Sequence, residues 1–140
     1  AEMRKLIKRA DVILPNVTEA CFLTDTEYKP ECDEAFAKQL AEKLTELTSA
    51  TIIVTGVEKN GKIGELILNG GKYELVLLEK LPEKRHGTGD IFASVFTAKY
   101  LGGESLAASC AAASAFVIDC LKQTDPDHFY GVNFEKVLNK

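Results

Sequence analysis

Residues 51–55 read Thr-Ile-Ile-Val-Thr, a short β-branched run that ends at Gly56 and leaves few architectures open to the chain. A strand without polar alternation is typical of a parallel strand that is covered on both faces. A second apolar run lies upstream at 12–14, and the apolar positions between Asp33 and about Leu47 recur at the spacing of an amphipathic helix. Strand, helix and strand in this order predict a βαβ unit and therefore an α/β fold.

The rest of the chain predicts an antiparallel hairpin and several helices. Asn69-Gly70 lies between two strand-like segments, and Asn-Gly is the strongest short-range signal for a hairpin turn. The segment 104–122 is small or apolar on almost every side, so we expect that helix to be buried on most sides. The expected elements are, in chain order, helix 2–10, strand 12–14, helix 18–23 capped by Thr18, helix 33–47, strand 51–55, strands 62–68 and 72–78, helices 90–101 and 104–122, and a last helical turn at 134–138.

The composition excludes several classes of protein. The chain has 140 residues, of which 46% are hydrophobic and 27% charged, and this is the composition of one globular domain. Its net charge of −4 argues against nucleic acid as a partner, and no apolar run approaches the roughly 20 residues that span a bilayer. No pair of cysteines has CxxC spacing, so we expect reduced packing residues of a cytosolic protein at Cys21, Cys32, Cys110 and Cys120.

A glycine turn at the head of an apolar helix carries the most chemical information, and it consists of Gly87, Thr88, Gly89 and Asp90. Two glycines let the backbone approach a ligand closely, and the first N–H groups of a helix favour an anion. The turn therefore predicts an anion hole for a phosphoryl group, while plain helix stabilisation by Asp90 is the alternative. Neither a P-loop nor a dinucleotide fingerprint is present in the sequence.

Two smaller constellations follow the predicted strands. Asn16 and Glu19 could hold Mg²⁺ directly or through water, because ligands gather beyond the carboxyl ends of strands in α/β sheets. Alternatively, this pair could only start the next helix, with Glu19 in its first turn. Thr55 and Gly56 could contact phosphate oxygens, or they could form a plain turn.

Taken together, three segments resemble the carboxy-terminal half of the vitamin kinases of the ribokinase superfamily, and most closely the pyridoxal kinases. The likeness covers most of the chain. The sugar kinases usually carry Gly-Ala-Gly-Asp, so Thr88 is typical of the vitamin branch, and Asp90 replaces a cysteine that is common in hydroxymethylpyrimidine kinases. The segments are 10–20 (Ala-Asp-Val-Ile-Leu-Pro-Asn-Val-Thr-Glu-Ala), 54–56 (Val-Thr-Gly) and 86–94 (His-Gly-Thr-Gly-Asp-Ile-Phe-Ala-Ser).

The resemblance implies a ribokinase-like, three-layer α/β/α, Rossmann-like sheet, of which residues 1–140 form the carboxy-terminal, ATP-binding and catalytic half with a β-hairpin. It implies transfer of the γ-phosphoryl group of ATP to the 5′-hydroxymethyl group of pyridoxal, pyridoxine or pyridoxamine, the salvage reaction of vitamin B6. Members of this family are about twice as long, so we expect the amino-terminal half to be missing and the isolated chain to be inactive.

The resemblance also implies residue roles. Asp90 would be the catalytic base, and Gly87, Thr88 and Gly89 would form the anion hole. Asn16 and Glu19 would organise Mg²⁺, Thr55 and Gly56 would contact the nucleotide phosphates, and Val117 would either line the adenine pocket or pack in the core. ATP and Mg²⁺, with a monovalent cation such as K⁺, are the implied cofactors of a cytoplasmic and homodimeric parent protein. A hydroxymethylpyrimidine kinase, a sugar kinase and a non-catalytic nucleotide-binding module are the alternatives.

Overall fold

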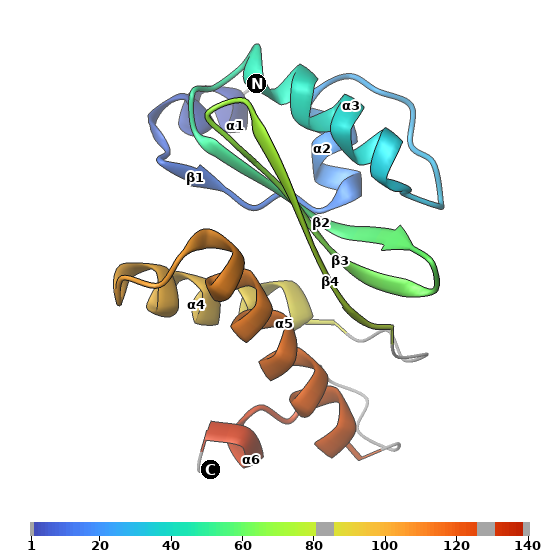
Figure 1. Ribbon diagram of the computed structural model, residues 1–140, viewed down its shortest axis with the longest axis vertical. Coiled ribbons are helices and arrows are strands. Elements are labelled where there is room, and N and C mark those ends of the chain that lie inside the picture. Colours follow the sequence, from blue (N-terminus) through green and yellow to red (C-terminus); the bar gives the residue numbers. More distant parts are fainter. Residues whose placement is uncertain (1, 81–85, 126–130, 139–140) are drawn as a thin grey trace. The chain divides into compact units, whose positions relative to one another are not determined.

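The computed structural model describes residues 2–80, 86–125 and 131–138, which fall into two compact units at 1–77 and 78–140 (Figure 1). Each unit is described by itself. The elements are α1 (Glu2–Leu6), a 3₁₀ turn η1 (Ile7–Arg9), β1 (Val12–Ile13), α2 (Val17–Leu23), α3 (Glu34–Thr45), β2 (Thr51–Lys59), β3 (Lys62–Asn69), β4 (Lys72–Glu79), α4 (Thr88–Leu101), α5 (Leu106–Gln123) and α6 (Glu135–Leu138).

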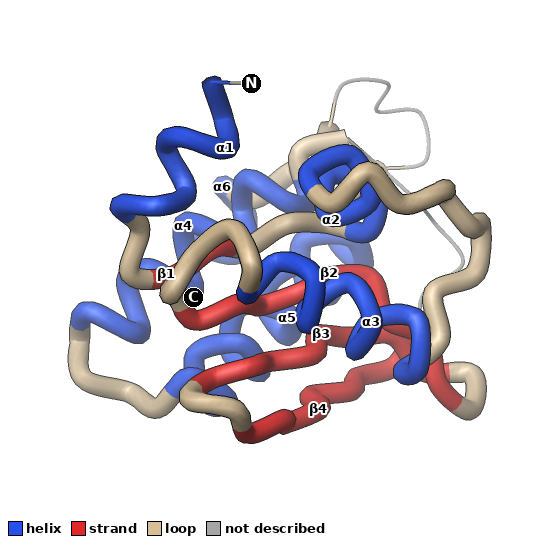
Figure 2. Tube along the Cα trace, turned by 90° about the horizontal axis from the view of Figure 1, so that it is seen from above, coloured by secondary structure: helices blue, strands red, loops and turns tan. Residues whose placement is uncertain are grey.

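The first unit is built on a mixed four-stranded sheet with the order β1-β2-β3-β4. β1 runs parallel to β2, with Val12 opposite Thr51, and β2 runs antiparallel to β3. The chain passes from β1 to β2 through α2 and α3, which lie on one side of the sheet (Figure 2). The predicted βαβ unit and the α/β class are therefore confirmed.

Two hairpins join the last three strands. In each, the two connecting residues have positive φ angles, 51° and 74° at Asn60 and Gly61 and 55° and 78° at Gly70 and Gly71, as a type I′ turn requires. The second hairpin was predicted from its Asn-Gly signal. The first was missed, although Asn60-Gly61 is the same signal, because Gly56 was interpreted as the end of β2.

The core of the first unit lies between α3 and one face of the sheet. Asp33 caps α3 by accepting a hydrogen bond from the N–H of Phe36 at 2.8 Å. Phe36, Leu40 and Leu44 form the predicted stripe, and all three are buried against apolar side chains of β2 and β3. Each such side chain stabilises the fold by roughly 1.5–3 kcal/mol. The strand residues in this core are Ile13, Ile52, Val54, Val57, Leu66 and Leu68.

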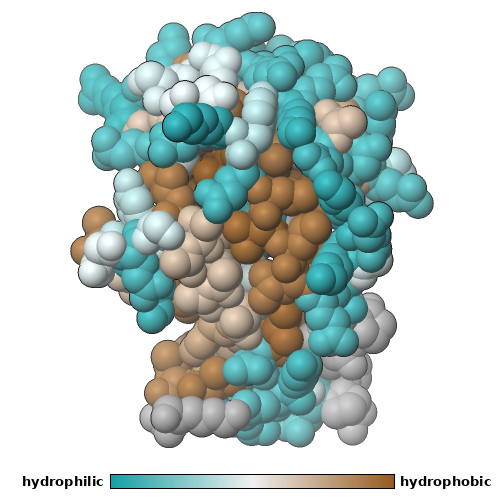
Figure 3. Space-filling view, viewed as in Figure 1, coloured by the Kyte–Doolittle hydropathy of each residue, from teal (hydrophilic) through white to brown (hydrophobic). Residues whose placement is uncertain are grey.

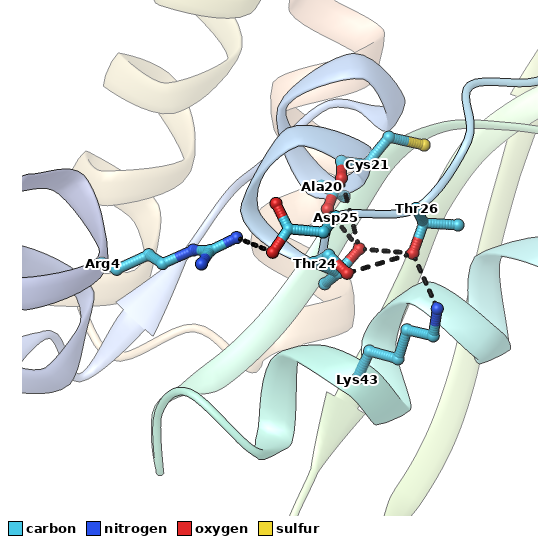
Figure 4. Close-up of polar contacts among 7 residues, drawn as sticks. All are labelled: Arg4, Ala20, Cys21, Thr24, Asp25, Thr26 and Lys43. Carbon is cyan, nitrogen blue, oxygen red and sulfur yellow. Dashed lines mark hydrogen bonds and ion pairs between the residues drawn. The ribbon is translucent and has the colours of Figure 1, made fainter. Parts of the chain in front are cut away.

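A polar network at the end of α2 ties three helices together (Figure 4). Asp25 has a left-handed φ of 50°, and the next N–H, of Thr26, donates to the carbonyl of Cys21 at 2.9 Å, so α2 ends in a Schellman-type turn. Lys43 of α3 donates to Thr26 Oγ1 at 2.9 Å, and Arg4 of α1 pairs with Asp25 at 2.7 Å. The expected helix 2–10 is shorter, because its last turn is the 3₁₀ turn η1.

The second unit pairs α4 with α5. On α4, the buried rings of Phe92 and Phe96 stack with centroids 6.3 Å apart, and Phe96 stacks on Tyr100 at 5.7 Å. A small cluster of Cys120, Val132 and Val137 connects α5 to the residues that follow it. The predicted last helical turn is present as α6.

Helix α5 departs from one expectation. Only Ser109, Cys110, Ala113 and Cys120 are buried on it, so the helix is not buried on most sides, and Figure 3 shows apolar side chains gathered along it. By length and composition alone, this helix of 18 residues is the one described helix that could cross a bilayer. Core helices of water-soluble proteins meet the same criterion, and four buried small residues are typical of helix packing.

The four cysteines are buried thiols, and this confirms the prediction that they are reduced packing residues. Burial raises the pKa of Cys32 to about 11, with a smaller contribution from Asp33, and burial also raises the pKa values of Cys21 and Cys120. Because the thiolate is the reactive form, the raised pKa values lower the reactivity of these three side chains.

Candidate active site

The first group of candidate residues lies where the parallel pairing of β1 and β2 ends. Asn16 forms an isolated parallel bridge with Thr55, and the N–H of Thr55 donates to the carbonyl of Pro15 at 3.0 Å. Gly56 has a φ of 85° and occupies a bulge between Thr55 and Val57. The structure thus brings Asn16, Glu19, Thr55 and Gly56 together. Thr55 and Gly56 lie inside β2, however, and not at its carboxyl end as expected.

Asn16 and Glu19 form a capping box at the start of α2. Asn16 Oδ1 accepts a hydrogen bond from the N–H of Glu19 at 2.9 Å, and Glu19 Oε2 accepts one from the N–H of Asn16 at 2.9 Å. The helix-start interpretation of this pair is therefore present in the structure. The expectation that Thr18 caps the helix is wrong. Asn16 is the N-cap residue, and Glu19 therefore stands at the third helical position, from which its carboxylate completes the capping box.

The capping box also limits how these residues could hold Mg²⁺. It occupies Asn16 Oδ1 and one oxygen of the Glu19 carboxylate, and it leaves Glu19 Oε1 outside the box. Both residues are exposed, and among the described residues no three His, Cys, Asp or Glu side chains are grouped to hold a metal ion. Since Mg²⁺ commonly keeps several waters and takes one or two carboxylates plus substrate phosphates, the donors present fit that mode of binding.

The second group of candidate residues lies at the start of α4. Gly87 is the N-cap residue and has a left-handed φ of 85°, so it offers no capping side chain to the helix. A Cβ atom at Gly87 or Gly89 would meet nothing within 4 Å, which leaves open space beside the backbone. The first i→i+4 hydrogen bond of the helix runs from the N–H of Ile91 to Gly87, at 3.1 Å. The preceding N–H groups lie at the positive end of the helix dipole, where an anion is favoured.

Asp90 is exposed in the first turn of α4. A reactant could therefore reach it. Ser94, one turn later, donates to the backbone carbonyl of Asp90 at 2.8 Å, so it does not engage the carboxylate. Val117 is half-buried on α5, and its role in an adenine pocket stays a prediction.

Sequence reasoning missed one residue of interest, Glu65 on β3. It lies directly opposite Thr55 in the β2–β3 register and is only 5% exposed. Directly paired residues share a sheet face, so a buried carboxylate borders the Thr55–Gly56 bulge. In the sequence, the only sign of this residue is one charge directly before the apolar run 66–68. That Glu65 lies opposite Thr55 follows only once the hairpin between β2 and β3 is known.

Solved kinases share this architecture. The pyridoxal kinase of Lactobacillus plantarum superposes with a TM-score of 0.85 at 30% identity, over 98% of this chain and 51% of that one. A Bacteroides thetaiotaomicron protein described as a phosphomethylpyrimidine kinase, in a crystal form with pyridoxal, superposes with a TM-score of 0.87 at 34% identity, over 99% and 51%. The chain therefore has the ribokinase-like fold of the vitamin kinases, as its resemblance implied.

The family follows from the sequence match. Residues 1–132 match the model of the phosphomethylpyrimidine kinase family, and the chain belongs to this family. Over 122 residues it is 30% identical to a hydroxymethylpyrimidine/phosphomethylpyrimidine kinase of Aquifex aeolicus. The aligned region covers 86% of this chain and 47% of the relative. The chain thus spans about half the length of each of these three relatives.

Proposed function

We propose that this chain is the ATP-binding and catalytic half of a kinase that phosphorylates the 5′-hydroxymethyl group of pyridoxal, pyridoxine or pyridoxamine. The observation that carries the proposal is the start of α4, where a left-handed Gly87 and an open Gly89 precede an exposed Asp90. The likeness to a relative crystallised with pyridoxal supports this substrate class, and membership of the family supports a kinase.

In the proposed reaction, Asp90 accepts the proton of the substrate hydroxyl. The oxygen of that hydroxyl forms a bond to the γ-phosphorus of ATP, while the bond between the γ-phosphorus and the oxygen of the β-phosphate breaks. The N–H groups of Gly87, Thr88 and Gly89 stabilise the negative charge on the transferring group. Mg·ATP supplies the phosphoryl group and neutralises charge on its oxygens. Glu19 Oε1 would accept hydrogen bonds from the waters of Mg²⁺, and Asn16 would keep Glu19 in place through the capping box.

The remaining residues would bind the nucleotide. The Thr55–Gly56 bulge offers a hydroxyl and an open backbone to phosphate oxygens, and Val117 offers an apolar contact for the adenine ring. We extend the proposal to a monovalent cation such as K⁺ as a second cofactor, and to a cytoplasmic, homodimeric parent protein that binds neither nucleic acid nor membrane.

The role of Asp90 is tested by Asp90→Asn in the full-length kinase that contains these residues. We expect kcat to fall about 10²–10⁴-fold, because general base catalysis is lost, while ATP still binds. Asp119→Asn, an exposed aspartate on α5, is the matched control and should leave kcat unchanged. Unchanged turnover of Asp90→Asn, measured by product formation under saturating substrates, would sink the assignment of the base.

The substrate class is tested by a panel of acceptors. The family match and the Aquifex relative favour hydroxymethylpyrimidine as the second candidate, whereas Asp90 favours pyridoxal. We expect the highest kcat/KM for a B6 vitamer, lower values for hydroxymethylpyrimidine and none for ribose. A higher kcat/KM for hydroxymethylpyrimidine would replace the proposed substrate, and nucleotide binding without any product would indicate a non-catalytic module.

A further inference from the structure

We propose that residues 131–138, here called the tail segment, position the phosphate-binding turn at the start of α4, and that Thr124 is the residue that holds this segment in place. The proposal deepens the proposed function and rests on it, because it gives the turn a support that lies outside the turn itself. It concerns only contacts within the second unit.

Thr124 joins the end of α5 to the tail segment through a hydroxyl group that is used twice. The residue is 7% exposed, and its Oγ1 donates to the carbonyl of Cys120 at 2.6 Å. The same oxygen accepts a hydrogen bond from the N–H of Asn133 at 2.9 Å. The buried hydroxyl thus ties Asn133 to the end of α5, and removing it would leave the part-buried N–H of Asn133 without this acceptor.

The tail segment reaches the turn on both of its sides. Behind the turn, Ile91 follows Asp90 directly and packs on the cluster that Val132 and Val137 form with Cys120. Ahead of the turn, Gly131 lies beside the carbonyl oxygen of His86, since a Cβ built on Gly131 would be 3.5 Å from that atom. The two residues that flank Gly87–Asp90 therefore both lie next to the same segment.

This support matters because the turn begins at a glycine. Gly87 contributes no capping side chain, and the side of Gly87 and Gly89 where a Cβ would stand is open. The direction of the first N–H groups of α4 and of the Asp90 carboxylate therefore depends on where His86 and Ile91 are held. A displacement of about 1 Å at a reacting group can cost up to 100-fold in rate. The family match ends at residue 132, so α6 with Val137 lies beyond it.

Thr124→Val is the test, because it keeps the shape of the side chain and removes the hydroxyl. In the full-length kinase we expect kcat per folded molecule to fall about tenfold or more. Thr124→Ser restores the hydroxyl and should return kcat to within about twofold of the parent. Thr97→Val removes an exposed hydroxyl on α4 that bonds the carbonyl of Ala93 at 2.7 Å, and this control should leave kcat unchanged.

A second measurement does not need catalysis. Amide hydrogen exchange should be faster at Gly87–Ile91 in Thr124→Val than in the parent and in Thr124→Ser. If the parent lacks kinase activity, the proposed function fails, and the exchange experiment still decides the positioning role. A Thr124→Val protein with a lower melting temperature but unchanged kcat and unchanged exchange at Gly87–Ile91 overturns the inference, since the hydroxyl would then be merely structural.

Discussion

Gly64 has the least room of any glycine in the described chain. A Cβ on this β3 residue would lie 1.8 Å from the carbonyl oxygen of Val76 on β4, a distance that no packed atom tolerates. The backbones of the two strands approach closely here, so only glycine fits. The requirement is steric and not conformational, because Gly64 is absent from the glycines with positive φ.

We expect Gly64→Ala to lower the free energy of unfolding by about 3 kcal/mol or more, because the strands must move apart. Gly61→Ala is the matched control: it has open space around it and a φ of 74°, so it should cost only about 1–2 kcal/mol for the left-handed backbone. Urea denaturation of both variants measures the difference. Equal losses would show that the sheet relaxes around the new methyl group.

At the residue scale, the sequence predicts local chemistry better than contacts across strands. The spacing of Asn16 and Glu19 already contained the capping box, because that device depends on residues three apart. The position of Glu65 opposite Thr55 could not be predicted without the β2–β3 register, which the turn at Asn60-Gly61 and the bulge at Gly56 set together.

Among the elements, α3 and β2 are linked at the surface by a carboxylate of α3, in addition to their packed core. Glu34, in the first turn of α3, pairs with Lys38 one turn later at 2.7 Å and also with Lys59 at the end of β2. Hydrogen bonds from Lys38 and Lys59 lower the pKa of Glu34 to about 2. Because the carboxylate is partly solvated, the pair is screened by salt and its contribution to stability is modest.

The lowered pKa of Glu34 predicts a pH dependence. A folded-state pKa below the unfolded one gives stability that is present above about pH 5 and is lost as the pH falls towards 2. We therefore expect Glu34→Gln to be less stable than the parent at pH 6 and to approach it at pH 3. Glu31→Gln, an exposed loop variant, serves as the control. Urea titrations at the two pH values give the comparison, and a gap that widens at pH 3 would contradict the prediction.

The elements themselves were largely predictable, because each has a local signal. The stripe on α3, the β-branched run of β2 and the Asn-Gly turn before β4 all appear in the structure. The elements were predicted wrongly where one local sequence signal is compatible with two backbone structures. Gly56 was interpreted as a strand end, but a bulge with positive φ lets β2 continue to Lys59. The burial of α5 depends on what packs against it, which periodicity does not specify.

At the scale of the whole molecule, the chain corresponds to about half of the relatives it matches. It contains the proposed anion hole and base, and we propose that the substrate pocket belongs mostly to the other half of the parent kinase. The proposed role of each half follows from the family resemblance and from the place of Asp90 at the start of α4.

We therefore expect residues 1–140 alone to form no pyridoxal phosphate from Mg·ATP and pyridoxal. The full-length kinase, assayed beside it at equal concentration, provides the positive control. Absorbance or chromatography of the product decides the matter. Turnover by the isolated chain would mean that these residues carry a complete substrate site, and the division of roles between the halves would have to be withdrawn.

The two type I′ turns have a consequence for the order in which the first unit folds. β2, β3 and β4 follow one another through two-residue connections, so their pairings close short loops and should form within microseconds. β1 can pair with β2 only after the chain has passed through both α2 and α3, and such non-local parallel pairing is slow. We therefore expect the docking of β1, which brings Asn16 to Thr55, to be the late kinetic step, so that this end of the sheet is assembled last.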